Sequence, residues 1–133
     1  MSTPEPAPTV LVIEPDATTA DLYRRELSRR FRVLTSPSAR RAAGYLAVED
    51  VRAVVLEPLG AEADLEALRS ALADPTAPHP RALIVCSVLD DRRWSEMLGA
   101  ACHLVKPVLP MTLLEVVLQA CASPTDPASC LRE

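Results

Sequence analysis

Five apolar runs of strand length alternate with five segments of helical spacing, and this alternation leaves few folds open to the chain. The apolar runs are residues 10–13, 31–35, 53–56, 82–86 and 102–105. The helical segments are residues 17–29, 38–48, 62–73, 90–98 and 111–122. The runs are nearly continuous rather than alternating, which is typical of strands buried on both faces. The sequence therefore predicts an α/β protein with helices on both faces of a parallel sheet.

The chain of 133 residues fits one domain. We expect a core over residues 10–122, between a proline-containing tail of residues 1–9 and a second tail of residues 123–133. No apolar run approaches the ~20 residues of a membrane span and no signal-peptide pattern precedes the core, so we expect a cytoplasmic protein. The net charge of −4 argues against nucleic acid as a direct partner.

Polar side chains stand where the predicted strands end. Glu14, Glu57 and Ser87 each close an apolar run, and Lys106 follows the last one. The carboxyl ends of parallel strands meet at one edge of a sheet, so these groups outline one pocket. Lys106 is the only lysine beside thirteen arginines, and its compact ammonium is not interchangeable with a planar guanidinium. Asp16, at the start of the next helix, is predicted to cap that helix beside the acidic pocket.

Other site chemistries lack their residues. Only three glycines are present, and no GxGxxG or GxxxxGK[ST] loop exists to hold a nucleotide. The cysteines and histidines have no zinc spacing, and we expect no cofactor. A hydrolytic triad of Ser87, His103 and Asp90 would lack the glycines that flank a nucleophile elbow. The only support for a flavin-binding function is analogy with other proteins of this fold.

The strand-end residues resemble the pattern of a two-component response-regulator receiver domain over residues 9–122. That family has an acidic pair after strand one, an aspartate after strand three, Thr or Ser after strand four and Lys-Pro after strand five. The corresponding residues here are Glu14-Pro15, Glu57, Ser87 and Lys106-Pro107. The resemblance implies a flavodoxin-like, doubly wound (βα)5 fold whose five parallel strands lie in the order 2-1-3-4-5.

The resemblance also implies a role for each position. The family's aspartate takes a phosphoryl group from a histidine kinase, and its first acidic pair holds a divalent cation. The hydroxyl and the lysine contact the phosphoryl oxygens. Carried over to this chain, these roles fall on Glu57, Glu14, Ser87 and Lys106. His103 stands three residues before Lys106, where the family has its switching aromatic.

Two departures from the pattern predict a degenerate, pseudo-receiver variant. Glu57 is one methylene longer than aspartate, so its carboxylate extends into the space that a phosphoryl group needs. Pro15 replaces the second acid and removes a backbone N–H. We therefore expect no metal site beyond weak Mg²⁺ binding at Glu14 and Glu57. The expected function is that of a stand-alone, non-enzymatic receiver in bacterial signalling that acts through phosphorylation-independent protein–protein interaction.

Several alternatives stay open at the sequence level. The chain is alternatively a receiver still phosphorylated in a phosphorelay, or a small-ligand sensor using the strand-end pocket. Lys106 either neutralises Glu14 or Glu57 in a static ion pair or is kept for function. Ser87 either contacts a ligand or bonds local backbone. His103 is either a pH-sensitive rotor or a satisfied side chain.

The last part of the chain indicates an interaction surface. Gly99 lies only twelve positions after Ser87, so we expect the fourth helix or its leading loop to be truncated. The last helix has only a narrow polar stripe, whereas a helix on one side of a sheet needs a wide one. We expect a signalling partner or a second copy at the face of the fourth helix, fifth strand and fifth helix, unless the C-terminal tail covers it. The predicted contact is centred on whichever of Leu114, Val117, Leu118 and Cys121 point outward.

Overall fold

A computed structural model of the chain describes residues 7–76 and 81–122. The predicted C-terminal tail, residues 123–133, lies outside the described residues. The expectation that this tail packs over the last helix therefore also lies outside them. Most of the predicted N-terminal tail also lies outside them. Thr9, which the sequence assigned to that tail, is instead the first residue of a strand, and it is buried there.

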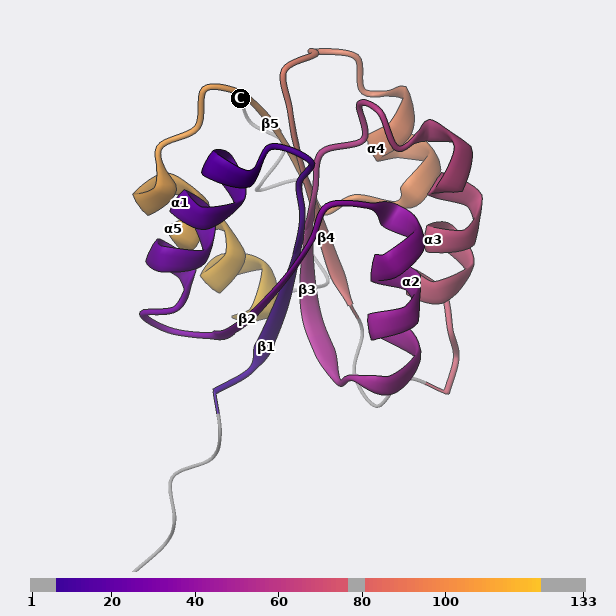
Figure 1. The fold of residues 1–133 in the computed structure, drawn as a ribbon, viewed down its shortest axis with the longest axis horizontal. Coiled ribbons are helices and arrows are strands. Elements are labelled where there is room, and N and C mark those ends of the chain that lie inside the picture. Colours follow the sequence, from indigo (N-terminus) through magenta and orange to yellow (C-terminus); the bar gives the residue numbers. More distant parts are fainter. Residues whose placement is uncertain (1–6, 77–80, 123–133) are drawn as a thin grey trace, which may run out of the picture.

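Five parallel strands form one sheet in the order β2-β1-β3-β4-β5, which confirms the predicted flavodoxin-like topology (Figure 1). The strands are β1 (Thr9–Ile13), β2 (Arg32–Ser36), β3 (Val51–Leu56), β4 (Ala82–Ser87) and β5 (Cys102–Val105). Every residue of β1 and β4 is buried, which matches their uninterrupted apolar runs. β2 lies at one edge of the sheet and is only partly buried.

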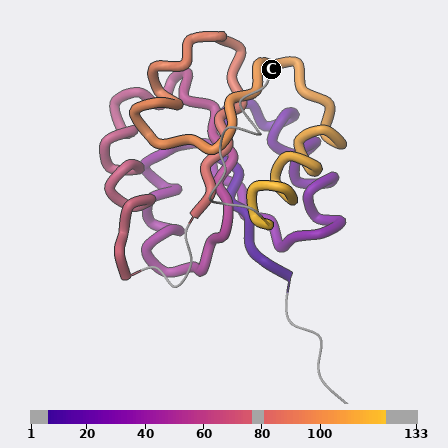
Figure 2. Tube along the Cα trace, turned by 180° about the vertical axis from the view of Figure 1, so that it is seen from behind, coloured from indigo at the N-terminus to yellow at the C-terminus, as the bar shows by residue number. Residues whose placement is uncertain are grey.

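Two helical layers cover the sheet, as Figures 1 and 2 show from opposite sides. The helices are α1 (Ala17–Leu27), α2 (Ala39–Val48), α3 (Leu65–Leu72), α4 (Arg93–Leu98) and α5 (Pro110–Ala122). Leu27 of α1 and Val117 of α5 belong to one apolar cluster with one face of the strands. Leu46 of α2, Leu68 of α3 and Leu98 of α4 belong to a second cluster on the other face. This arrangement leaves the strand ends as the place where polar side chains can gather.

Side-chain caps explain where the first two helices begin. The predicted cap Asp16 is confirmed, because its carboxylate accepts the Thr19 amide at 2.9 Å. Ser38 caps α2 in the same way through the Arg41 amide. At the end of α4, Gly99 adopts a left-handed conformation with φ of 71°, which a residue without Cβ adopts at low cost.

Two predicted helices begin three residues later in the structure than the sequence predicts. The segment predicted as one helix over residues 62–73 begins as a 3-10 turn, Glu62–Asp64, and only then continues as α3. α4 begins at Arg93 rather than at residue 90, because the Asp91 side chain folds back onto the Arg93 amide. Neither start has a side-chain cap bond of the kind seen in α1 and α2. The fourth helix is therefore short, at six residues.

Candidate functional site

The four strand-end groups meet at the carboxyl edge of the sheet. Glu14 follows β1, Glu57 follows β3, Ser87 ends β4 and Lys106 follows β5. Adjacent pairing of β1 with β3, β3 with β4 and β4 with β5 puts these ends side by side. Both glutamates are 4% exposed, so their carboxylates are almost wholly removed from water. Buried carboxylates need partners, and the site supplies them.

Lys106 bridges the two glutamates. Its Nζ lies 2.5 Å from Glu14 Oε1 and 3.1 Å from Glu57 Oε1. Burial by itself would lower the pKa of Lys106, but hydrogen bonds and charge from the two glutamates outweigh it and raise the pKa above its ordinary value. The ammonium is therefore charged at neutral pH, and it faces two carboxylates.

The Glu57 carboxylate is held by backbone as well as by Lys106. Its Oε1 accepts the Val88 amide at 3.2 Å, and its Oε2 accepts the Leu59 amide at 3.1 Å. These amides belong to the loops after β4 and β3. Together with Lys106, these two amides surround the Glu57 carboxylate with hydrogen-bond donors. The Glu57 carboxylate is therefore the anion that the donors at this edge of the sheet bind.

Glu14 and Asp16 do different work. Glu14 Oε2 accepts the Asp16 amide at 3.1 Å, across Pro15, which has no amide hydrogen to give. Asp16 itself is exposed, and the hydrogen bond from the Thr19 hydroxyl, together with the amide bond, lowers the pKa of its carboxyl. Its carboxylate forms the helix cap and makes no ion pair with Lys106. The second acidic side chain near the pocket is thus committed to α1.

Ser87 bonds the local backbone. Its hydroxyl accepts the Leu89 amide at 3.1 Å, and its carbonyl accepts the Lys106 amide at 2.7 Å. The first bond orders the loop after β4, the loop that also presents the Val88 amide. The second continues the pairing of β4 with β5 to the residue that carries the ammonium. Ser87 therefore positions both donors that meet Glu57 Oε1.

His103 is buried, at 2% exposure. Its Nδ1 lies 2.5 Å from the Ser95 hydroxyl, and its Nε2 lies 3.3 Å from the Leu89 carbonyl oxygen. Both ring nitrogens are engaged, and the ring joins α4 to the loop after β4. His103 does not contact Ser87, so the hydrolytic triad considered from the sequence is not assembled.

A tyrosine–cysteine contact lies beneath the site. The Tyr23 hydroxyl of α1 lies 3.3 Å from Cys86 Sγ of β4, and both groups are buried. Burial raises the pKa of the Tyr23 phenol and also that of the Cys86 thiol, with the two site glutamates adding to both shifts. The sequence gives no signal that links Tyr23 to Cys86, sixty-three positions away.

The donor set does not fit a divalent cation. Within residues 7–76 and 81–122, no group of three or more His, Cys, Asp or Glu side chains is arranged for metal binding. The two carboxylates at the strand ends already accept the Lys106 ammonium and three backbone amides. A hard cation would have to displace these donors, and Pro15 brings no carboxylate in exchange.

The structure shows which of the predicted contact residues on α5 point inward. Leu114 is 8% exposed and Val117 is fully buried, because both face the core shared with α1. Leu118 and Cys121 are half-buried and pack against the same core. Most of the apolar side chains of this helix are thus covered by the rest of the fold.

None of the helices in the described part of the chain is long and apolar enough to cross a membrane.

No protein-family model and no curated protein matches the sequence. Solved structures do resemble the fold. A response regulator from Thermotoga maritima is 24% identical with a TM-score of 0.74, and the match covers 88% of this chain and 99% of that one. A CheY-like receiver domain protein from Methanospirillum hungatei JF-1 is 18% identical with a TM-score of 0.77, over 88% and 95% of the two chains.

An orphan response regulator of H. pylori is 15% identical with a TM-score of 0.70, over 89% of this chain and 98% of that one. Each of these matches spans nearly the whole of the protein compared. At such low sequence identity, these matches show a shared fold and do not show a shared activity. The chain has the fold of response-regulator receiver domains.

Proposed function

We propose that this chain is a receiver-type signalling module without enzymatic activity, which works by phosphorylation-independent protein–protein interaction. The observation that carries the proposal is the Glu57 carboxylate, held by the Lys106 ammonium and by the Val88 and Leu59 amides. In a receiver, an aspartate at this position would become phosphorylated, and the added anion would then meet the lysine. Here the longer side chain brings its own anion to that place.

The geometry disfavours phosphoryl transfer to Glu57 for two reasons. The carboxylate is buried, and its oxygens already accept hydrogen bonds, so an incoming phosphoryl donor would have to displace them. The neighbouring acid, Glu14, is paired with Lys106 and lacks the second carboxylate that a cation site needs. Phosphoryl transfer relies on groups that position the phosphoryl donor and neutralise its charge, and here these groups already bind the two glutamates.

The switch position supports a fixed state. His103 is buried and bonded at both ring nitrogens, to Ser95 of α4 and to the Leu89 carbonyl. Ser87, which orders the same loop, also positions the Val88 amide against Glu57. The strand-end anion and the buried ring are therefore joined through one loop, so the module would hold a single arrangement without a modification step.

Intact-mass measurement after incubation with acetyl phosphate and Mg²⁺ tests the proposal. We expect no phosphoryl adduct on the parent chain. The Pro15→Asp/Glu57→Asp double variant restores the family pattern and serves as the positive control, with an adduct that hydroxylamine removes. An adduct on the parent that Glu57→Gln abolishes would contradict the proposal and favour the phosphorelay alternative.

A second measurement asks whether Glu57 holds the loops. Glu57→Ala removes the anion and leaves the Leu59 and Val88 amides without their acceptor. We expect NMR signals of both amides to shift and those of His103 to follow, because the same loop carries its Leu89 contact. Glu62→Ala, an exposed acid in the next segment, is the matched control and should leave His103 unchanged. A Glu57→Ala spectrum identical to the parent at His103 would contradict the coupling.

A further inference from the structure

The charges of this acidic protein are strongly segregated along the chain. Residues 17–48 contain seven arginines and only two acidic residues, whereas the rest of the chain contains seven basic and sixteen acidic residues. The seven arginines are Arg24, Arg25, Arg29, Arg30, Arg32, Arg40 and Arg41, and all seven are exposed. A solvated, mixed surface would intersperse the two signs instead.

The fold gathers this segment at one edge. Residues 17–48 form α1, β2 and α2, and β2 is the outermost strand of the sheet. Figure 1 looks toward this edge, with β2 in front and α1 and α2 on either side of it. Four of the arginines pair with Asp21, Glu26 or Glu49. Arg30, Arg40 and Arg41 make no ion pair with any residue in the described ranges, so the edge carries a positive excess.

β2 also presents backbone groups on a side with which no described strand pairs. The Arg32 amide donates to the Pro8 carbonyl, and the Ser36 carbonyl accepts the Glu14 amide, so these two residues turn their backbone groups inward. Successive residues of a strand alternate in this respect, which turns the amides and carbonyls of Val33 and Thr35 outward. No described strand pairs with that side of β2. Such an edge is a template for an added strand.

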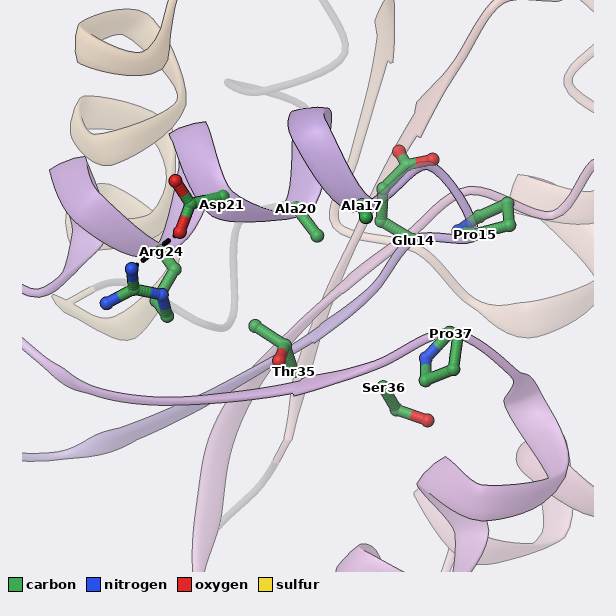
Figure 3. Close-up of a pocket in the computed structure, with 9 residues that line it drawn as sticks. All are labelled: Glu14, Pro15, Ala17, Ala20, Asp21, Arg24, Thr35, Ser36 and Pro37. Carbon is green, nitrogen blue, oxygen red and sulfur yellow. Dashed lines mark hydrogen bonds and ion pairs between the residues drawn. The ribbon is translucent and has the colours of Figure 1, made fainter.

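A pocket lies beside the carboxyl end of this edge (Figure 3). Its volume is about 300 Å³. Ala17, Ala20 and Pro37 give it an apolar lining, and Thr35 of β2 forms part of its wall. Asp21 and Arg24 lie at its rim, joined to each other by an ion pair. A pocket of this kind takes an apolar side chain from a chain lying along β2.

We propose that the β2 edge is a docking site for an extended, acidic segment of a partner protein. The segment adds to β2 through the outward groups of Val33 and Thr35, its acidic side chains meet the surrounding arginines, and one apolar side chain enters the pocket. Nucleic acid fits less well, because it cannot pair with a strand edge and the rest of the chain would repel it. The proposed docking surface extends beyond the strand-end site, with which its pocket shares Glu14, and docking does not depend on whether Glu57 is phosphorylated.

The test uses the full chain and synthetic peptides of about ten residues that alternate glutamate with valine, a length that covers a strand of ordinary size. We expect NMR shifts at the Val33 and Thr35 amides and binding that weakens from about 0.05 M to about 0.3 M salt. A glutamate–proline peptide has the same charge but lacks the amide hydrogen of every second residue and has a backbone restricted by proline. A lysine–valine peptide has the opposite charge. Both should fail to shift these amides.

Matched charge reversals locate the surface. Arg30→Glu/Arg40→Glu removes two unpaired cations from the edge and should weaken binding about tenfold. Arg69→Glu/Arg93→Glu makes the same change of charge away from the edge and should leave binding within about twofold. Equal loss in both pairs would overturn the proposal, as would equal binding of the proline peptide.

Two further outcomes would also overturn it. Binding of a duplex oligonucleotide in place of the acidic peptide, with the same loss in Arg30→Glu/Arg40→Glu, would make the edge a nucleic-acid surface. Self-association lost in that variant would make the edge an interface between copies of this chain.

Thr35→Pro removes one outward amide of β2 and should abolish peptide binding, whereas Thr35→Ala keeps this amide and should keep the binding. Far-UV circular dichroism of each variant checks that the fold is intact.

Discussion

At the residue scale, Lys106 alone neutralises two buried carboxylates, because its ammonium pairs with both Glu14 and Glu57. Replacing such a group of charges by apolar residues is often harmless, whereas removing one member leaves an unpaired charge in a poorly solvated place. The backbone amides of Leu59 and Val88 add further donors around Glu57. The site is thus stable as a set and vulnerable to the loss of its cation.

We expect Lys106→Met to lower the free energy of unfolding by about 2 kcal/mol, between the values for solvated and wholly buried pairs, since Lys106 remains 15% exposed. Urea unfolding at neutral pH measures this. Adding Glu14→Gln should recover part of the loss by removing a like charge. Arg93→Met, which breaks an exposed pair with Asp91, is the control and should cost under about 1 kcal/mol. A Lys106→Met variant as stable as the parent would show that the lysine is not needed for stability.

Tyr23 and Cys86 predict a pH dependence on the alkaline side. Burial raises the pKa of both groups in the folded chain, so the unfolded chain releases their protons first as the pH rises. Fewer protons on the unfolded chain mean that stability falls with rising pH, and the raised pKa of Lys106 acts in the same direction. These contributions are fully present at neutral pH and begin to be lost above about pH 9.

Tyr23→Phe should therefore make the alkaline fall in stability shallower, and it should cost under about 1 kcal/mol at pH 7 through loss of the contact with Cys86. Urea unfolding at a series of pH values between about 7 and 11 measures both effects. Tyr45→Phe is the matched control, because this tyrosine is 38% exposed, and it should leave the slope unchanged. An unchanged slope in Tyr23→Phe would contradict the assignment.

At the element scale, Arg81 ties two helices together. Its guanidinium donates to the Ala71 carbonyl at the end of α3 and to the Leu46 carbonyl near the end of α2, each at 2.8 Å. These are carbonyls of the kind that a helix end leaves without partners. The third nitrogen, Nε, is buried without a hydrogen-bond partner, which limits the net gain.

We expect Arg81→Ala to lower the free energy of unfolding by about 2 kcal/mol, since two bonds from a charged group are lost in a partly buried place. Arg81→Lys should recover less than half, because one ammonium cannot reproduce the planar fork that reaches both helices. Arg69→Ala, which breaks an exposed pair with Glu66, should cost under about 1 kcal/mol. Similar costs for Arg81→Ala and Arg69→Ala would mean that the tie adds nothing.

The burial pattern of α5 decides which of Leu114 and Leu118 faces the core. Leu114→Glu should unfold the chain or cost more than about 3 kcal/mol, because the new charge is placed against the core beneath α1. Leu118→Glu should be tolerated at about 1 kcal/mol, because Leu118 is half-buried. Thermal unfolding distinguishes them, and sedimentation equilibrium shows whether Leu118→Glu changes the association state. Equal effects at the two positions would contradict this placement of the helix.

At the scale of the whole molecule, the sequence predicts the architecture well because parallel sheets are specified by local pattern. The runs Val10–Ile13 and Ala82–Cys86 have no alternation, which identifies strands covered on both faces. Once the strands are parallel, their carboxyl ends meet, and Glu57 and Lys106 are brought together without further information. The pairing of the site was thus accessible from the sequence.

Other features depend on packing between distant segments and leave no local trace. The contact of Tyr23 with Cys86 joins α1 to β4, and Arg81 joins the ends of α2 and α3. The direction in which Leu114 points depends on how α5 rotates against α1, which a nearly uniform apolar helix does not fix. The exposed edge at β2 is visible only when the order of the strands is known.

Hydrogen exchange provides a test of the whole architecture. The amides of β1, β3 and β4 lie in strands paired on both sides, so they should exchange only through global unfolding. The outward amides of Val33 and Thr35 in β2 should exchange much faster, because they have no described partner and border solvent. NMR exchange rates at neutral pH measure the contrast residue by residue. Protection of Val33 and Thr35 equal to that of β1 would mean that the edge is covered in solution, and the free strand edge assigned here would be wrong.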